Sequence, residues 1–216
     1  MLNSSLYLNG TYDEVVCNVD QSSTGVCSNI NGKNRTINIF DEFNKEICNS
    51  IIEKLLEWEE EDSKILQNHS KLLKQVEDKS TLLKPITINI NSPGGNVDDL
   101  FAIIDMLNSM TAKVITRAIG KACSCGFILF TLGDERIVGN NSSLMYHDVS
   151  YGYRGQYNDH DNYMKHVRKI RCRIDDIICK KTKLTKKKIN EWKKNPDTWF
   201  DAVDAINVGI ATSRLY

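Results

Sequence analysis

Gly120-Lys121-Ala122-Cys123-Ser124-Cys125-Gly126 is the most informative segment of this chain, because it carries one serine between two apolar stretches. Residues 114–119, before it, have the composition of a buried strand, and residues 127–130, after it, continue as a helix. We therefore predict a strand–turn–helix unit with Ser124 on the tight turn. Backbone N–H groups and the helix dipole at such a position favour negative charge, which makes Ser124 a candidate nucleophile.

The overall composition restricts the classes of function. The 216 residues suit one domain with a sizeable core, and 28 basic against 28 acidic residues give no argument for nucleic acid or an anionic membrane as partner. The seven cysteines include no Cys-x-x-Cys pair and no zinc-finger spacing, so we expect reduced thiols, no metal and a cytoplasmic location. No stretch is apolar enough to span a bilayer, and residues 1–32 lack a signal-peptide pattern.

The periodicity of apolar residues predicts an α/β protein with mostly parallel strands. We expect strands at residues 36–40, 85–91, 114–119, 136–138 and 143–147, and helices at residues 41–60, 98–109, 127–132, from 159 onward and up to Gly209. Residues 1–34, rich in Ser, Asn and Gly, are expected to be a flexible segment, and residues 35–216 to form the folded domain. The charged residues 63–84 fit either a helix extension or a surface insertion.

The long helix from about residue 159 carries a narrow apolar stripe. Its members are spaced by four and three residues, which suits packing on another helix: Tyr163, Val167, Ile170, Ile174 and Ile177. Residues 165–194 around it are rich in Lys and Arg. We interpret that run as a solvated helix face rather than a nucleic-acid site.

A serine nucleophile needs a base, and the base works best when a carboxylate fixes its tautomer. Of the four histidines, His147 differs from the others because it ends an apolar strand soon after the serine helix. Asp197 is the candidate carboxylate, in a turn that we expect to start the last helix. From these residues alone, a purely structural role for His147 stays open.

Oxyanion stabilisation requires N–H donors that can approach the substrate closely. Gly94-Gly95, in Ser92-Pro93-Gly94-Gly95, is a backbone segment without side chains, and the N–H of Cys125 follows the serine directly. Taken alone, the glycine pair also fits an ordinary strand-to-helix turn.

Four separated motifs together resemble the proteolytic subunit family of Clp protease (ClpP). They are Ile90-Asn91-Ser92-Pro93-Gly94-Gly95, then Ile119-Gly120-x-Ala122-x-Ser124-x-Gly126, then Met145-Tyr146-His147 with Arg154-Gly155-Gln156, and Asp197-x-Trp199-Phe200-x-Ala202-x-Asp204-Ala205. Their order and approximate spacing agree from about Arg35 to the end of the sequence.

The resemblance implies a crotonase-like α/β fold with repeated β-β-α units and a protruding handle helix at about residues 148–182. It implies a serine endopeptidase with Ser124 as nucleophile, His147 as general base and acid, and Asp197 orienting His147. The backbone N–H groups of Gly95 and Cys125 would form the oxyanion hole. No cofactor or metal is implied.

The resemblance also implies an assembly and partners. Subunits of this family form seven-membered rings that stack in pairs around a chamber, the handle helix mediates contact between rings, and residues 1–32 would correspond to axial pore loops. The substrates would be unfolded polypeptides, fed by a separate AAA+ unfoldase. The chain itself has no Gly-x-x-x-x-Gly-Lys-Ser/Thr loop for ATP.

Several positions depart from the family pattern. Cys123 and Cys125 flank the serine in place of alanine and methionine, and Lys121 replaces glutamine, which makes a Ser–Lys dyad conceivable. Asp148-Val149 follows His147 in place of Gln-Pro, and Pro196 stands where an arginine involved in ring contacts often lies. The segment 63–84 is absent from typical members. We therefore predict a divergent member, encoded by a virus or plasmid or belonging to an organelle such as a plastid.

Three other functions remain as alternatives. A capsid-maturation protease of the phage type can share the fold and acts without an ATPase. A catalytically silent ring subunit would shape a mixed complex, although the intact Ser124, His147 and Asp197 argue against it. An acyl-CoA enzyme shares the crotonase fold, but its chemistry does not require a serine nucleophile.

Overall fold

A mostly parallel sheet forms the centre of the structure, a computed structural model that describes residues 35–68 and 76–215. Within these residues the sheet contains seven strands: β1 (Thr36–Ile39), β2 (Ile86–Ser92), β3 (Val114–Cys123), β4 (Glu135–Val138), β5 (Ser143–Tyr146), β6 (Thr198–Phe200) and β7 (Ser213–Arg214). The order is β1-β2-β3-β4-β7, and β5 pairs with β3 and with β6. The β5–β6 pair is antiparallel, whereas the other described pairs are parallel. The flexible segment expected at residues 1–34 lies outside the described residues.

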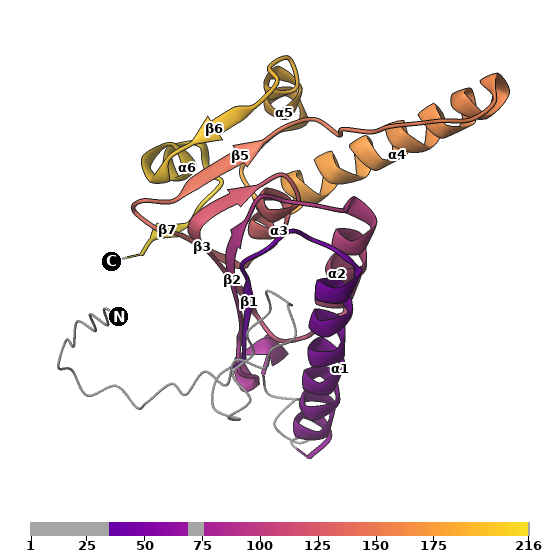
Figure 1. Cartoon of the computed structure of the whole chain (residues 1–216). Helices are drawn as coiled ribbons and strands as arrows, with labels where there is room; N and C mark the ends of the chain where they lie inside the picture. The colour runs from indigo at the N-terminus through magenta and orange to yellow at the C-terminus, as the bar shows by residue number, and fades with distance from the viewer. Residues whose placement is uncertain (1–34, 69–75, 216) are drawn as a thin grey trace, which may run out of the picture.

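Helices separate most of these strands along the chain. They are α1 (Lys45–Asn68), α2 (Val97–Ser109), α3 (Cys125–Thr131), α4 (Tyr157–Lys181), α5 (Lys186–Trp192) and α6 (Ala202–Val208), with a short 3-10 helix, η2, at Lys79–Leu82. In Figure 1, α1 and α2 lie side by side against the sheet, and α4 projects away from the body of the molecule. The strand–helix alternation confirms the α/β class.

Strand β3 is longer than the sequence pattern indicates, and it bends at Gly120. The first half of β3 pairs with β4 and the second half pairs with β5, so the bend transfers the strand from one neighbour to the other. Gly120 has φ +86, a conformation that favours glycine, and an added Cβ there would lie 2.8 Å from Asn91 Oδ1. The expected turn at residues 120–123 is therefore strand, and the chain turns at Ser124.

Helix α1 also exceeds its expected length, because it continues through residues 63–68. Its buried residues, including Ile47, Ile51 and Leu55, follow a helical spacing and pack into the same core as the alternating isoleucines of β2. The first part of the charged segment 63–84 is thus a helix extension. Residues 69–75 lie outside the described part of the chain.

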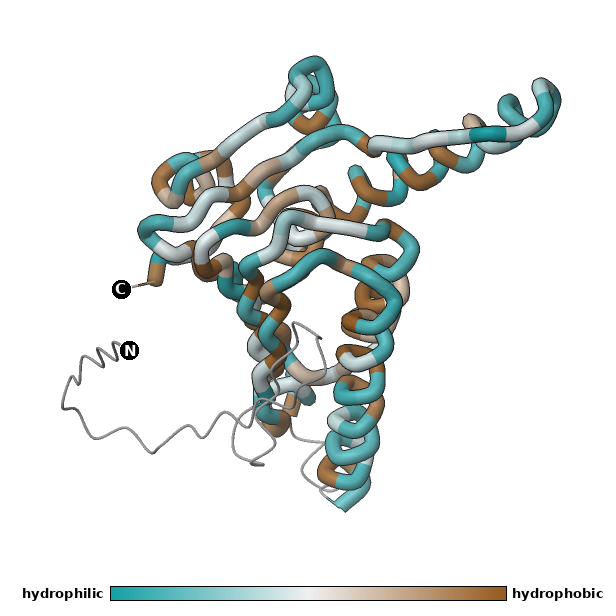
Figure 2. The backbone as a smooth tube through the Cα atoms, viewed as in Figure 1, coloured by the Kyte–Doolittle hydropathy of each residue, from teal (hydrophilic) through white to brown (hydrophobic). Residues whose placement is uncertain are grey.

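Helix α4 has two parts with different environments. Val167, Ile170 and Ile174 are buried, and α4 contacts α3, so this part of the predicted stripe packs within the chain itself. The turns before Val167 project from the body, and Tyr157 at the start is 86% exposed. Figure 2 shows mainly hydrophilic and near-neutral residues at this projecting end, while the central strands are largely hydrophobic.

Candidate active site

Ser124 occupies a strained turn between β3 and α3. Its φ is +53 and its ψ is −117, and it is the single non-glycine residue with positive φ in the part of the chain that the structure describes. Its N–H donates to the Met145 carbonyl at 2.9 Å, which ties the turn to β5. Strain of this kind persists where the surroundings enforce it, as at functional sites.

The Gly94-Gly95 segment lies against the serine turn. A Cβ added to Gly94 would lie 2.6 Å from Ser124 Cβ, so the two backbones are in close contact. Phe43 bridges the segment from the other side, because its N–H donates to Gly94 O at 2.7 Å and its carbonyl accepts from Asn96 N at 2.9 Å. The Gly95 N–H has no hydrogen-bond partner among the described residues, so it can donate to a ligand.

Cys125 contributes both its backbone and its side chain. The thiol donates to the Gly95 carbonyl at 3.1 Å, and burial raises the pKa of this thiol to about 11. Burial also raises the pKa of the Cys123 thiol. Both cysteines therefore stay protonated near neutral pH, which does not suit a cysteine nucleophile. The Cys125 N–H, at the first position of α3, has no intrahelical acceptor.

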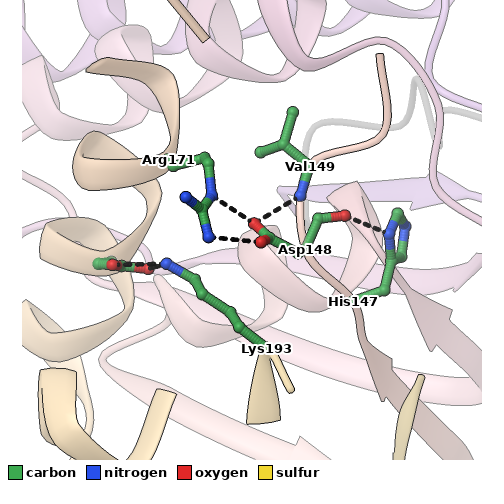
Figure 3. Close-up of polar contacts among 6 residues, drawn as sticks. His147, Asp148, Val149, Arg171 and Lys193 are labelled. Carbon is green, nitrogen blue, oxygen red and sulfur yellow. Dashed lines mark hydrogen bonds and ion pairs between the residues drawn. The ribbon is translucent and has the colours of Figure 1, made fainter. Parts of the chain in front are cut away.

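His147 follows β5 and is half-buried. Its Nδ1 lies 2.6 Å from the carbonyl oxygen of Asp148, a contact that is drawn as a dashed line in Figure 3. A carbonyl oxygen can only accept, so Nδ1 carries the hydrogen and Nε2 of the neutral ring is an acceptor. This is the tautomer that a general base requires.

Asp197 lies directly before β6, and not at the start of a helix as the sequence pattern indicates. Strand β6 intervenes before α6, and the pairing of Tyr146 with Thr198 leaves His147 and Asp197 at the adjoining positions of two antiparallel segments. Residues opposite each other in such a pair share a face. Within the described residues, however, no hydrogen bond joins His147 to Asp197, and Asp197 is exposed.

Two ion pairs beside His147 were not expected from the sequence. Arg171 of α4 holds the Asp148 carboxylate with Nε at 2.8 Å and a terminal nitrogen at 2.5 Å, and the Val149 N–H donates to it at 2.8 Å. Burial alone would raise the pKa of the Asp148 carboxyl, but Arg171 and the Val149 N–H hold this pKa below its ordinary value. The one signal in the sequence was the departure from Gln-Pro at residues 148–149.

The second pair joins Lys193 to Asp175. The Lys193 ammonium lies 2.7 Å from both carboxylate oxygens, and the two side chains are 8% and 10% exposed. Each ion pair joins a residue beside the site, Asp148 or Lys193, to a residue of α4 (Figure 3). The two pairs therefore hold the site against that helix.

A cavity of about 420 Å³ brings these groups together. Ser124, Gly95, Cys125 and His147 line it, along with an apolar wall formed by Ile128, Val149, Val167, Ile170 and Ile174. The arrangement offers a hydroxyl, an imidazole, backbone N–H donors and space for an apolar group. Within the described residues, no three His, Cys, Asp or Glu side chains are placed to share a metal ion.

Comparison with known proteins gives consistent matches. The family described as Clp protease matches residues 67–213, which is more than half of the chain. The ATP-dependent Clp protease proteolytic subunit 2 of Treponema denticola is 29% identical over 178 residues, which cover 82% of this chain and 79% of that protein. None of the helices described above combines the length and apolar character needed to cross a bilayer.

Proposed function

Because the chain belongs to the Clp protease family and is thereby a peptidase with a ClpP-like fold, we propose that it is a serine endopeptidase subunit that cleaves unfolded polypeptides. One observation carries the proposal: Ser124, His147 and the Gly95 backbone line a single cavity. The strained backbone of Ser124 and the tautomer of His147 further support it.

The proposed reaction proceeds through an acyl-enzyme. Ser124 Oγ attacks the peptide carbonyl carbon while His147 Nε2 takes its proton, and the N–H groups of Gly95 and Cys125 stabilise the oxyanion. The C–N bond then breaks, and His147 gives its proton to the leaving amine. Water attacks the ester in the second half, with His147 again as base, and Ser124 regains its hydrogen.

Asp197 is proposed as the carboxylate that stabilises the imidazolium formed in each half-reaction. Its support is the β5–β6 register, which leaves it opposite His147. A negative charge near the ring favours its protonated form without direct proton transfer.

The proposal includes the assembly and its partners. The name of the Treponema denticola relative describes a subunit of an ATP-dependent protease, and the present chain has no nucleotide-binding loop. We therefore propose stacked seven-membered rings in the cytoplasm of a cell or organelle, served by a separate AAA+ unfoldase. Alone, the protein should cleave only short peptides.

A fluorophosphonate probe combined with native mass measurement tests this function. We expect one probe per subunit on Ser124 and a ring-sized particle. The Ser124→Ala variant should lose label and peptidase activity, while Ser143→Ala, an exposed serine on β5, should keep both. Undiminished activity in Ser124→Ala would exclude this nucleophile. An assembled wild-type protein that takes up no label would instead favour the silent ring subunit.

A further inference from the structure

We propose that Asp148 and Arg171 are positioning residues for His147: their ion pair fixes the main-chain carbonyl that orients the imidazole. The inference rests on the proposed function, because it concerns the base of that reaction. It assigns a role to the Asp148 position, where the chain departs from the family pattern.

The contacts form a continuous path. Two guanidinium nitrogens of Arg171 hold the two carboxylate oxygens of Asp148, at 2.8 and 2.5 Å, and the Val149 N–H donates to one of those oxygens. This bidentate geometry restrains the side chain and its backbone together. The carbonyl of the same residue lies 2.6 Å from His147 Nδ1, so the restraint extends to the imidazole (Figure 3).

Arg171 is itself held in a fixed place relative to the nucleophile. It lies between Ile170 and Ile174 on α4, and both isoleucines are buried in the core that α4 shares with α3. Helix α3 begins directly after Ser124. The ion pair therefore anchors the base to α4, which packs on the helix that begins after the serine. This matters because small displacements of a catalytic group reduce the rate strongly.

The main-chain carbonyl of Asp148 has one of the roles that the carboxylate has in a catalytic triad. It accepts the Nδ1 hydrogen, so Nε2 remains free to take a proton from Ser124. Asp197 then supplies charge rather than the tautomer. We accordingly expect Asp197→Asn to lower kcat by less than the roughly 10⁴-fold loss that occurs where the carboxylate alone sets the tautomer.

The test compares Arg171→Met, Arg171→Lys and Asp148→Asn with Arg168→Met, an exposed arginine on the same helix. With a short peptide substrate, Arg171→Met should lower kcat about tenfold with little change in KM, because the base is misplaced. Lysine cannot make the bidentate contact, so Arg171→Lys should recover only part of the loss. Arg168→Met should match the wild type.

The pH profile separates positioning from a merely structural role. Charged or titratable residues from each packed element line the cavity with His147: Asp98 on α2, Cys125 on α3, Tyr163, His166 and Arg171 on α4, Lys193 after α5, and Tyr146, Asp148 and Tyr151 on its own segment. Asp197, before β6, lies opposite His147 in the β5–β6 register. Of these groups, the Arg171→Met and Asp148→Asn variants change only the Asp148–Arg171 ion pair. Arg171→Met leaves a carboxylate beside the ring, so the acidic limb of kcat/KM should move about half a unit to higher pH. Asp148→Asn leaves a guanidinium there and should move it to lower pH.

Each outcome has one reading. An Arg171→Met variant with wild-type kcat and an unmoved acidic limb would overturn the proposal, and so would an increase in kcat, which would mean that the carbonyl restrains His147 unproductively. Fluorophosphonate labelling of the same preparations keeps the two proposals apart. A wild-type protein that labels on Ser124 upholds the proposed function even if the Arg171 variants contradict the positioning role.

Discussion

Gly94 controls the space in front of the nucleophile. Its φ is +113, and a Cβ there would lie 2.6 Å from Ser124 Cβ and 3.1 Å from Ser124 Oγ. We expect Gly94→Ala to displace the serine turn, lower kcat/KM at least 10²-fold and cost about 1–3 kcal/mol of unfolding free energy. Peptide hydrolysis and urea unfolding measure the two effects.

Gly152 offers the matched control, because it lines the same cavity and an added Cβ there meets nothing within 4 Å. The Gly152→Ala variant should remain within about twofold of wild-type activity. Equal losses in both variants would show that the contact between Gly94 and Ser124 is not the cause.

The buried Cys125 thiol predicts an alkaline loss of stability. Burial raises its pKa to about 11 from an ordinary 9.0, so between these values the unfolded chain releases a proton that the folded protein keeps. Stability therefore falls as pH rises through this window, by on the order of 2–3 kcal/mol from this group. Urea unfolding under reducing conditions at about pH 8 and about pH 11 measures the loss.

Two serine variants isolate this contribution. Cys125→Ser has no thiol to titrate there and should lose less stability on going to high pH, while Cys172→Ser, an exposed thiol on α4, should behave like the wild type. If all three proteins lose stability equally, the buried thiol is not the source.

At the residue scale, the sequence could predict which types of side chain meet but not how they are joined. Ser124 and His147 follow from local patterns, because each comes directly after a strand that points to the same edge of the sheet. The bond from His147 to its neighbour's carbonyl depends on a rotamer and a local backbone bend, which no spacing encodes. Arg171 lies 23 residues beyond Asp148 on a helix whose orientation only the folded chain defines.

A buried ion pair between Lys193 and Asp175 joins α4 to the segment after α5. Lys193→Met would leave the Asp175 carboxylate buried without its partner, and we expect a loss of about 3–5 kcal/mol. The double variant Lys193→Met/Asp175→Leu should recover most of it, because apolar groups of similar size pack there without an unpaired charge. Lys194→Met, at the exposed neighbouring position, is the control. A loss below about 1 kcal/mol in Lys193→Met would contradict the prediction.

At the element scale, periodicity located most helices and strands, and it failed where tertiary contacts set the boundary. Strand β3 continues past Ile119 because Ser142 Oγ accepts from Gly120 N at 3.1 Å and donates to Ala118 O at 2.8 Å, which supports the bend. The sequence pattern assigns residues 198–200, the short β6, to the start of the last helix, since three residues give no usable strand period. Its pairing with β5 is a long-range event that a local window does not contain.

The projecting end of α4 is the feature of the whole molecule that a single chain does not explain. Its outer turns project from the body (Figure 1), and the aromatic side chains near them contact one another: Tyr153 stacks on Tyr163 with ring centroids 4.9 Å apart, and Tyr151 is tilted against Tyr163 at 6.1 Å. Tyr157 is 86% exposed and Tyr151 is 45% exposed, and exposed aromatic groups are typical of surfaces that another protein covers. The proposed contact between stacked rings supplies such a cover.

Assembly can therefore be weakened at this end without touching the active site. The Tyr157→Ser variant removes an aromatic side chain that is 86% exposed and does not line the cavity, and we expect native mass measurement to shift from stacked double rings of subunits toward smaller particles, at least tenfold at micromolar concentration. Asp161→Ser, a polar substitution on the same projecting turns, should leave the distribution unchanged. An unaltered particle in the tyrosine variant would mean that the projecting end of α4 does not join the rings. A parallel loss in both variants would mean instead that the helix itself had been disrupted, which circular dichroism of the same samples would reveal.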